Sequence, residues 1–160
     1  MKKLLCVILP FLFILFCSCD TDIKKDKDID LNLNFTSKAQ IDYQGTAFTA
    51  EIHSTESGCS AVFIAPEELK GMETSYNGTE FTYTLGELKF TSLPHRETSQ
   101  FLKLIYEALR KTDYSTEKSE NGYKVYSSLN GLTYYLNINK EQHTPTYFEV
   151  ESIDLNIKFG

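Results

Sequence analysis

Short runs of alternating apolar and polar residues, separated by turn sequences, occupy most of this 160-residue chain. Asn-Gly pairs occur at Asn77-Gly78, Asn121-Gly122 and Asn130-Gly131, each between two such runs. An Asn-Gly pair supplies the two positive φ angles that a type I′ turn requires, and this turn joins neighbouring antiparallel strands. The chain is therefore expected to fold as an antiparallel meander, in which strands that follow one another in sequence pair in space.

The first predicted strand is long and half-buried. In residues 31–43 most positions of one parity are apolar and those of the other parity are polar. Gln44-Gly45 ends this strand, and a second strand repeats the alternation over residues 48–52. Residues 61–65 are apolar on both parities, which predicts a more central strand covered on both faces.

Seven more strands complete the prediction, three before residue 98 and four after residue 111. They occupy residues 72–76, 81–85, 88–90, 114–119, 123–128, 132–138 and 148–159. In the last of these strands the apolar parity changes, from Phe148 and Val150 to Ile153 and Leu155. This change predicts a β-bulge or a bend near Glu151-Ser152, and such features curve a sheet.

Residues 98–111, TSQFLKLIYEALRK, carry the amphipathic pattern of a helix. Their apolar side chains cover about 200° of the helical wheel, against a usual minimum of about 100°. Glu107 and Lys111 have the i,i+4 spacing of an ion pair on a solvated helix surface. A face this wide fits a concave surface, and a sheet of about ten strands tends to curl. We therefore expect an α+β fold, mainly antiparallel β: a curved, incomplete barrel with one amphipathic helix across its concave face.

Residues 1–18 have the pattern of a signal peptide. Lys2 and Lys3 precede an apolar run of 14 residues, which is short for a membrane-spanning helix of about 20. The end of this run, Phe16-Cys17-Ser18-Cys19, resembles a bacterial lipoprotein signal. In that family the leader is cut before the cysteine, whose thiol carries a diacylglyceryl group. The resemblance implies a lipid anchor on Cys19; an uncleaved anchor and secretion with a free Cys19 are the alternatives.

Three regions follow from this organisation: a lipoprotein signal peptide over residues 1–18, an anchored cysteine with a charged tether over residues 19–30, and a folded domain over residues 31–160. Without the leader the chain has 14 basic and 22 acidic residues, a net charge of −8. Direct partners such as nucleic acid or an anionic membrane surface require a basic surface, so this charge argues against them.

Neither a metal site nor a catalytic site is expected. The histidines His53, His95 and His143 are far apart, and none has a second ligand at metal-site spacing. Glu67 and Glu68 are interpreted as solvated turn residues and not as an acid and base pair. The sequence has no nucleophile elbow and no phosphate loop, so we expect no enzyme activity and no cofactor.

The cysteines and tyrosines are assigned structural roles. Three of the four cysteines lie in the N-terminal segment, so a disulfide framework is not expected. Cys59 begins an apolar run and is interpreted as a small buried hydrophobe, with a reactive or metal-binding thiol as the alternative. For the many tyrosines on predicted strands, cross-strand packing is favoured over a glycan-binding platform.

One segment resembles a known family. Residues 65–72, APEELKGM, followed by Tyr76-Asn77-Gly78, a strand, a helix and further strands, resemble the LolA and LolB lipoprotein-carrier superfamily and small Gram-positive lipoproteins with the same half-barrel. The resemblance covers about residues 31–159. In that family an incomplete barrel, closed by helices, encloses an apolar cavity that binds acyl chains or other lipids. It implies a cavity lined by Phe81, Tyr83 and Leu85 from strands and by Phe101, Leu104, Ile105 and Leu109 from the helix.

The function implied is that of a membrane-anchored lipoprotein on the extracytoplasmic face of the cell membrane, which binds or carries a hydrophobic ligand such as a lipid or an acyl chain. The alternative is a non-enzymatic lipoprotein that binds a protein partner and so localises or regulates a cell-envelope protein.

Overall fold

The computed structural model describes residues 29–92 and 100–160. The predicted signal peptide, the lipid anchor on Cys19, nearly all of the charged tether, and His95 therefore lie outside the described residues. Within them, eleven strands form one sheet in the order β6-β5-β4-β3-β2-β1-β11-β10-β9-β8-β7. Every neighbouring pair is antiparallel, and β1 pairs with β11, which joins the two halves of the chain. The predicted meander is confirmed.

The described elements follow the predicted order closely. Before the helix lie β1 (Phe35–Tyr43), β2 (Thr46–Thr55), β3 (Gly58–Ala65), the 3-10 turn η1 (Glu67–Leu69), β4 (Glu73–Tyr76), β5 (Phe81–Leu85) and β6 (Leu88–Ser92). The helix α2 (Gln100–Leu109) is followed by β7 (Ser115–Ser119), β8 (Gly122–Leu129), β9 (Leu132–Asn139), β10 (Pro145–Val150), the 3-10 turn η2 (Glu151–Ile153) and β11 (Leu155–Phe159).

The last predicted strand is in fact two strands. The parity change near residue 151 was assigned to a bulge or bend, but η2 reverses the chain there, and Asp154 adopts a left-handed backbone with φ 51°. In the resulting hairpin Phe148 lies opposite Ile157, and Val150 lies opposite Leu155. Because paired residues share a face of the sheet, all four side chains point inward although their parity in the sequence differs.

Of the three turns predicted at Asn-Gly pairs, one has the expected conformation and two differ from the prediction. Asn130-Gly131 has positive φ at both residues, as a type I′ turn requires. At Asn77-Gly78 only the glycine has positive φ; the Asn77 side-chain oxygen instead accepts hydrogen bonds from the Thr79 and Glu80 backbone N–H groups, at 2.9 and 3.0 Å. This is an Asx turn within a longer loop, so the type I′ prediction was wrong there. Gly122 is the first residue of β8 and lies outside its turn.

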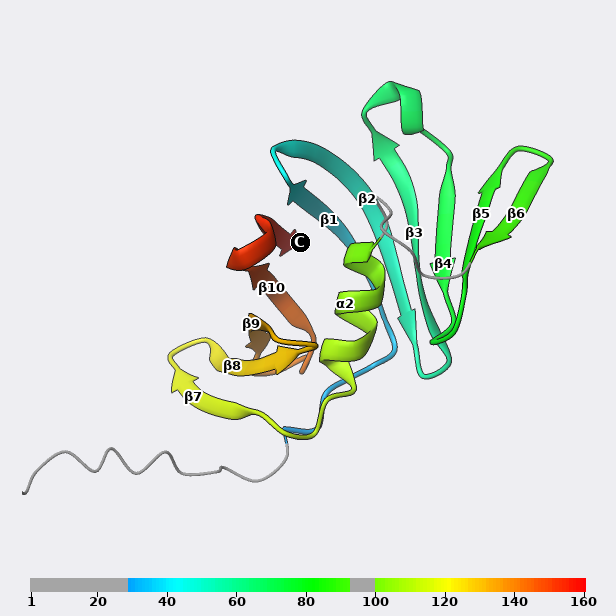
Figure 1. Ribbon diagram of the computed structural model, residues 1–160. Helices are drawn as coiled ribbons and strands as arrows, with labels where there is room; N and C mark the ends of the chain where they lie inside the picture. The colour runs from blue at the N-terminus through cyan, green and yellow to red at the C-terminus, as the bar shows by residue number, and fades with distance from the viewer. Residues whose placement is uncertain (1–28, 93–99) are drawn as a thin grey trace, which may run out of the picture.

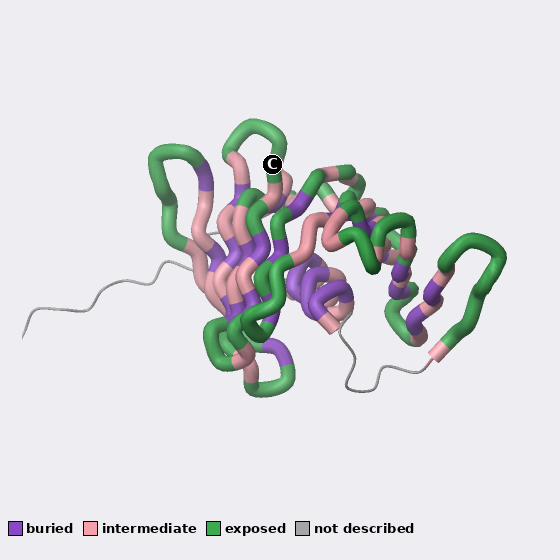
Figure 2. Tube along the Cα trace, turned by 90° about the horizontal axis from the view of Figure 1, so that it is seen from above, coloured by how far each residue is buried: buried purple, intermediate pink, exposed green. Residues whose placement is uncertain are grey.

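The sheet curves around α2. Figure 1 shows the helix between the wing formed by β1–β6 and the wing formed by β7–β10, and Figure 2 shows that the helix lies inside the curve and consists largely of buried residues. The helix contacts β3 and β4 on one wing and β8 on the other. The structure is thus an α+β fold with a curved, unclosed sheet and, in its described part, one α-helix on the concave face.

The wide apolar face of α2 explains this position. Six of its side chains are buried: Phe101, Leu102, Leu104, Ile105, Ala108 and Leu109. Burial of this many apolar side chains contributes on the order of 10 kcal/mol before entropy is counted. The predicted ion pair of Glu107 with Lys111 is not formed, because the helix ends at Leu109; Glu107 lies 3.7 Å from the Lys103 ammonium, one turn earlier.

The outer face of the sheet carries no second layer in the described part of the chain. On β3 the inward residues Cys59, Ala61 and Phe63 are buried, whereas Val62 is half-buried and Ile64 is 41% exposed. The expectation of a strand covered on both faces was therefore wrong. The interpretation of Cys59 as a buried hydrophobe is confirmed, and burial raises the pKa of its thiol to about 12.

Cross-strand aromatic packing, predicted for the tyrosines, is present on both faces. Tyr76 and Phe81 lie opposite each other with ring centroids 4.7 Å apart. Tyr126 and Tyr135 form a T-shaped pair at 5.2 Å. Such pairs contribute to the stability of a sheet in the same way as i,i+4 pairs contribute to that of a helix.

Candidate functional site

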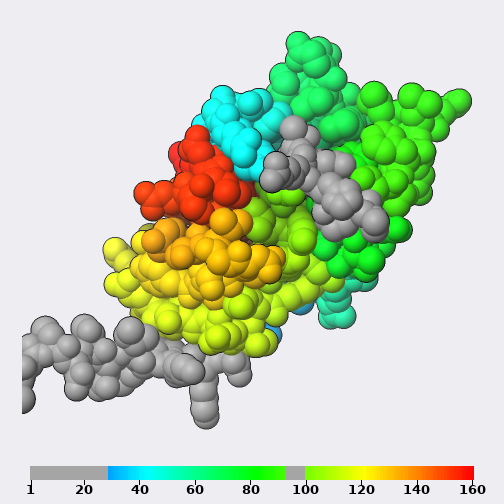
Figure 3. Space-filling view, viewed as in Figure 1, coloured from blue at the N-terminus to red at the C-terminus, as the bar shows by residue number. Residues whose placement is uncertain are grey.

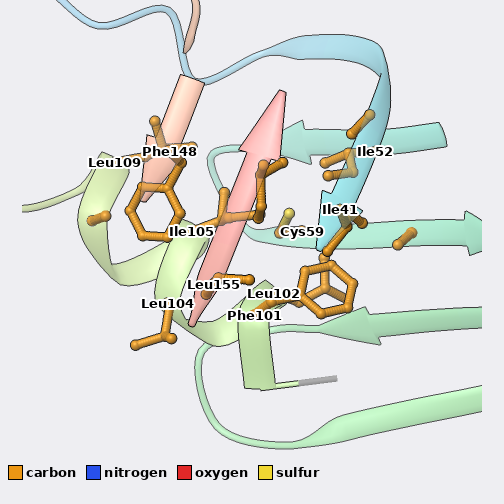
Figure 4. Close-up of a cluster of buried hydrophobic side chains, with 14 of the residues drawn as sticks. Ile41, Ile52, Cys59, Phe101, Leu102, Leu104, Ile105, Leu109, Phe148 and Leu155 are labelled. Carbon is orange, nitrogen blue, oxygen red and sulfur yellow. The ribbon is translucent and has the colours of Figure 1, made fainter. Parts of the chain in front are cut away.

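The space between α2 and the sheet is occupied by the protein's own side chains. Phe101 and Ile105 are 0% and 1% exposed, and the Phe101 ring meets the Phe63 ring edge-on at 6.4 Å. Figure 4 shows the helix residues pointing into a cluster with side chains of β1, β2, β10 and β11. On the other side of the helix, the buried Tyr134 hydroxyl donates to the Ala108 carbonyl at 3.4 Å. These contacts make this region a packed core.

Of the seven residues predicted to line a cavity, all but one belong to the same hydrophobic cluster. Six of them are buried: Phe81, Tyr83, Phe101, Leu104, Ile105 and Leu109. Leu85 is 50% exposed near the tip of the β5–β6 hairpin, so it lies outside the core. Leu109 also lines a cavity at the surface, at the C-terminal end of α2.

That cavity, which we name the apolar groove, has a volume of about 280 Å³. Residues before β1 form one wall, and the end of α2 with the segment that follows it forms the other. The Ile29 backbone N–H donates to the Tyr114 hydroxyl at 2.9 Å, which ties the two walls together. The lining residues are Ile29, Leu31, Leu33, Leu109, Arg110, Lys111, Thr112 and Tyr114.

Two cationic residues of this lining follow directly after the helix. The Arg110 guanidinium donates to the Tyr106 carbonyl at 2.9 Å and to the Thr55 carbonyl, and it lies 3.7 Å above the centre of the Tyr106 ring. These contacts fix Arg110 against the helix. Lys111 forms no ion pair with any residue of ranges 29–92 and 100–160, so its ammonium is available to an anionic group. An apolar groove with cations at its edge suits an amphiphile with an anionic head group.

A second apolar surface, which we name the hairpin stripe, lies on the β5–β6 hairpin. It consists of Leu85, Leu88 and Phe90, which are 50%, 71% and 63% exposed. Leu85 lies opposite Leu88, and the Phe90 ring stacks on the Tyr83 ring at 4.8 Å. In Figures 2 and 3 this hairpin projects from one end of the molecule. Neighbouring exposed apolar side chains on one surface are typical of an interaction site.

Ile29 was predicted to lie in the tether, and no groove was predicted at the C-terminal end of the helix. One signal was present, because the alternation of β1 extends backwards through Leu33, Leu31 and Ile29. These three residues are half-buried, so they continue the alternation of burial that is seen along the strand, although β1 itself begins at Phe35. The contact of this segment with Tyr114, 85 positions away, had no signal in the sequence.

The described residues offer few features of other site types. Residues 29–92 and 100–160 contain no group of three His, Cys, Asp or Glu side chains that could hold a metal ion. No helix in these ranges has the length and apolar character needed to cross a membrane.

Comparison with known proteins identifies the fold. The structure is similar to that of an uncharacterized conserved protein from Thermus thermophilus, with a TM-score of 0.50, 16% identity, and coverage of 78% of this chain and 74% of that one. The likeness is one of fold. Two more distant structures are a LolA superfamily protein from Nitrosomonas europaea (TM-score 0.36, 11% identity, 77% and 69% coverage) and a putative outer membrane lipoprotein-sorting protein domain from Vibrio parahaemolyticus (0.36, 12%, 75% and 66%). No family model and no curated protein matches the sequence.

Proposed function

We propose that the protein is a lipoprotein, anchored through Cys19 to the extracytoplasmic face of the membrane, which binds or carries a lipid or an acyl chain. The observation that carries this proposal is the apolar groove beside α2, with Arg110 and Lys111 in its lining. Apolar walls favour a hydrocarbon chain, because its transfer out of water contributes about 0.8 kcal/mol per buried CH₂. The cations favour a carboxylate or phosphate head group.

The position of the groove in the chain supports the same proposal. Ile29 lines it and lies ten positions after Cys19 in the sequence. Ten residues span at most about 36 Å when fully extended. A lipid on Cys19 would therefore hold the groove within that distance of the bilayer surface, where amphiphiles are concentrated.

The groove lies in a different part of the molecule from the cavity that the family resemblance implies. Beneath α2 the ring of Phe101 contacts the ring of Phe63, and these groups form a core that supports the helix. The proposed binding surface is therefore not formed by Phe101 and Ile105. It lies beyond Leu109, at the C-terminal end of the helix. A ligand there would contact the outer end of the core without displacing it.

Titration of the purified, delipidated protein with a dansyl-labelled fatty acid tests the proposal. We expect saturable binding with a blue-shifted emission. Leu33→Asp, which places a charge in the groove, should weaken binding at least tenfold, or about 1.4 kcal/mol. Lys111→Gln should weaken it less, because it removes only the head-group contact. Leu88→Asp makes the same substitution on the hairpin stripe and should leave the affinity unchanged.

Two results would refute the proposal. One is the absence of fatty-acid uptake together with the absence of co-purified lipid in mass spectrometry of the protein before delipidation. The other is equal loss of binding in Leu33→Asp and Leu88→Asp, which would show that the groove has no special part in binding. Circular dichroism of each variant confirms that it is folded.

The hairpin stripe favours a second candidate function, the binding of a cell-envelope protein. Among the described strands β6 forms one edge of the sheet, so its outer side pairs with none of them beside Leu88 and Phe90. A partner can add a strand to such an edge and cover the apolar side chains. A pull-down from solubilised envelopes should recover a partner with the unmodified protein and with Leu33→Asp, and lose it with Phe90→Asp. Recovery of nothing above background would argue against this candidate.

A further inference from the structure

A larger cavity, of about 650 Å³, lies on the outer face of the sheet, on the side opposite α2. We name it the outer cavity. Strands β1, β2, β10 and β11 form its floor, and the end of β3 with Pro66 forms one side. Figure 3 shows the surfaces of the β1–β2 turn and of the C-terminal strands side by side. Its polar lining residues are Gln40, Asp42, Thr49, Tyr147, Asn156 and Lys158.

The register of the sheet arranges these side chains in two rows. In one row Gln40 lies opposite Thr49 on β2 and opposite Lys158 on β11, and Lys158 lies opposite Tyr147 on β10. In the other row Asp42 lies opposite Ala47 and Asn156. Directly opposed residues have Cβ atoms about 5 Å apart. Hydrogen-bonding groups therefore repeat across the cavity at intervals comparable with the size of a sugar ring.

The composition of the lining narrows the ligand class. Asp42 and Lys158 are the charged residues of its lining, one of each sign, so the lining has no excess of cations. A polyphosphate or a nucleic acid needs several cations. The lining combines the six polar residues with five apolar ones, Ile41, Ala47, Phe48, Ala65 and Pro66, and this mixture suits a sugar ring, with its hydroxyl groups and C–H faces, better than a hydrocarbon chain. Hydroxyl groups both donate and accept hydrogen bonds, and this matches a mixture of amide, carboxylate, hydroxyl and ammonium groups.

One hydrogen bond joins two of the polar side chains of the lining. The Tyr147 hydroxyl donates to the Asn156 side-chain oxygen at 2.8 Å. The amide oxygen of Asn156 is thereby engaged, and its NH₂ group is left as a donor. Burial and the nearby Glu149 carboxylate raise the pKa of Tyr147, so its phenol stays protonated and keeps donating. The Tyr147 ring adds an aromatic surface, on which the C–H face of a sugar can stack.

We propose that the outer cavity binds a neutral saccharide of two or more pyranose units. Its volume lies within the range of about 300–1,000 Å³ typical of ligand sites. The proposal does not depend on the apolar groove, because the two cavities lie on opposite faces of the sheet and share no lining residue. Tyr147 would then be a glycan-binding tyrosine, whereas Tyr76 and Tyr134 belong to the core.

Solution NMR with chitotriose and cellotriose as probes tests this inference on the mature protein. We expect amide shifts confined to residues 40–49 and 147–158, with a Kd of about 1 mM or tighter, which corresponds to at least about 4 kcal/mol. Tyr147→Ala and Asp42→Asn should each weaken binding at least fivefold, and Tyr147→Phe should have a smaller effect. Glu120→Gln, the same carboxylate-to-amide change on the exposed β7–β8 turn, is the matched control and should leave the affinity unchanged.

Three outcomes would overturn the inference. The first is the absence of shifts with either trisaccharide in a protein whose spectrum is well dispersed. The second is binding that Tyr147→Ala and Asp42→Asn do not weaken. The third is a set of shifts at the same residues produced by inorganic phosphate or by a fatty acid in preference to the saccharides, which would assign the outer cavity to another ligand class.

Discussion

Replacing Phe101 with alanine tests whether α2 rests on a packed core or covers an open cavity. The Phe101 side chain is fully buried, and its ring meets that of Phe63 edge-on at 6.4 Å. Removal of a buried phenylalanine ring costs about 3–5 kcal/mol, from lost transfer energy and from the cavity left behind. About 1 kcal/mol of this belongs to the ring pair itself. We expect Phe101→Ala to lower the free energy of unfolding by about 4 kcal/mol.

The matched control is Phe90→Ala on the hairpin stripe. Phe90 is 63% exposed and contacts Tyr83 by stacking at 4.8 Å, so its loss should cost less than about 1 kcal/mol. Urea denaturation followed by far-ultraviolet circular dichroism measures both variants, since the chain has no tryptophan. For a domain of this size a loss of 4 kcal/mol also lowers the melting temperature by about 10–20 °C.

A loss of less than about 1 kcal/mol in Phe101→Ala, comparable with that in Phe90→Ala, would refute the reasoning. It would mean that the ring of Phe101 has few contacts in solution and that the face beneath α2 is loosely filled. The family expectation of an acyl-binding cavity beneath the helix would then replace the apolar groove as the first hypothesis. Fatty-acid affinity measured on the same two variants would show which surface binds the ligand.

Four further outcomes are expected. Gly78→Ala should destabilise the protein more than Gly86→Ala in urea denaturation, because both glycines have positive φ but only at Gly78 would the new Cβ lie 2.9 Å from the Tyr106 hydroxyl. The pKa of Cys59 is raised from 9.0 to about 12, so its reaction with a disulfide reagent at pH 8 should be at least about 100-fold slower in the folded than in the unfolded protein. Because the unfolded thiol ionises first, this group should make unfolding easier as pH rises from 9.0 to about 12, measurable by denaturation at each pH. Arg110→Lys should cost about 1–2 kcal/mol in the same assay, because an ammonium cannot reproduce a guanidinium that stacks on Tyr106 and donates to two carbonyls.

The regular parts of the fold could be predicted because their periods are unambiguous. The helix was predicted over residues 98–111 and is described over Gln100–Leu109, since seven apolar residues recur there at helical spacing. The hairpin of β10 and β11 was missed because its turn has neither glycine nor an Asn-Gly pair. Asp154 provides the left-handed residue there, and aspartate occurs in many other settings. The change of parity was the visible sign, but a bulge and a reversal both produce it.

The candidate sites were harder to predict, because their residues come from distant parts of the chain. Leu31 and Tyr114 line one groove only because β1 pairs with β11 and thereby brings the start of the domain beside the end of α2. The outer cavity depends on register: Gln40 and Lys158 are neighbours because Ile41 lies opposite Ile157. A shift of one residue would turn these polar side chains into the core. Neither site has a local sequence motif.

The location of α2 on the concave face determines which apolar surface remains for a ligand. Apolar residues point inward along both wings of the sheet, but the helix contacts β3, β4 and β8 and buries the residues between them. The groove beyond Leu109 and the stripe on β5–β6 are therefore what this packing leaves uncovered. Such a surface binds a lipid specifically only if polar groups at the edge of the surface hold the lipid's head group. At the groove Arg110 and Lys111 supply these polar groups. The stripe carries Lys89 on the strand between Leu88 and Phe90, but β6 is also an edge of the sheet that the described strands form, and a protein strand can pair with such an edge whereas a lipid cannot. The same packing thus favours a lipid at one end of the helix and a protein at the free edge of the sheet.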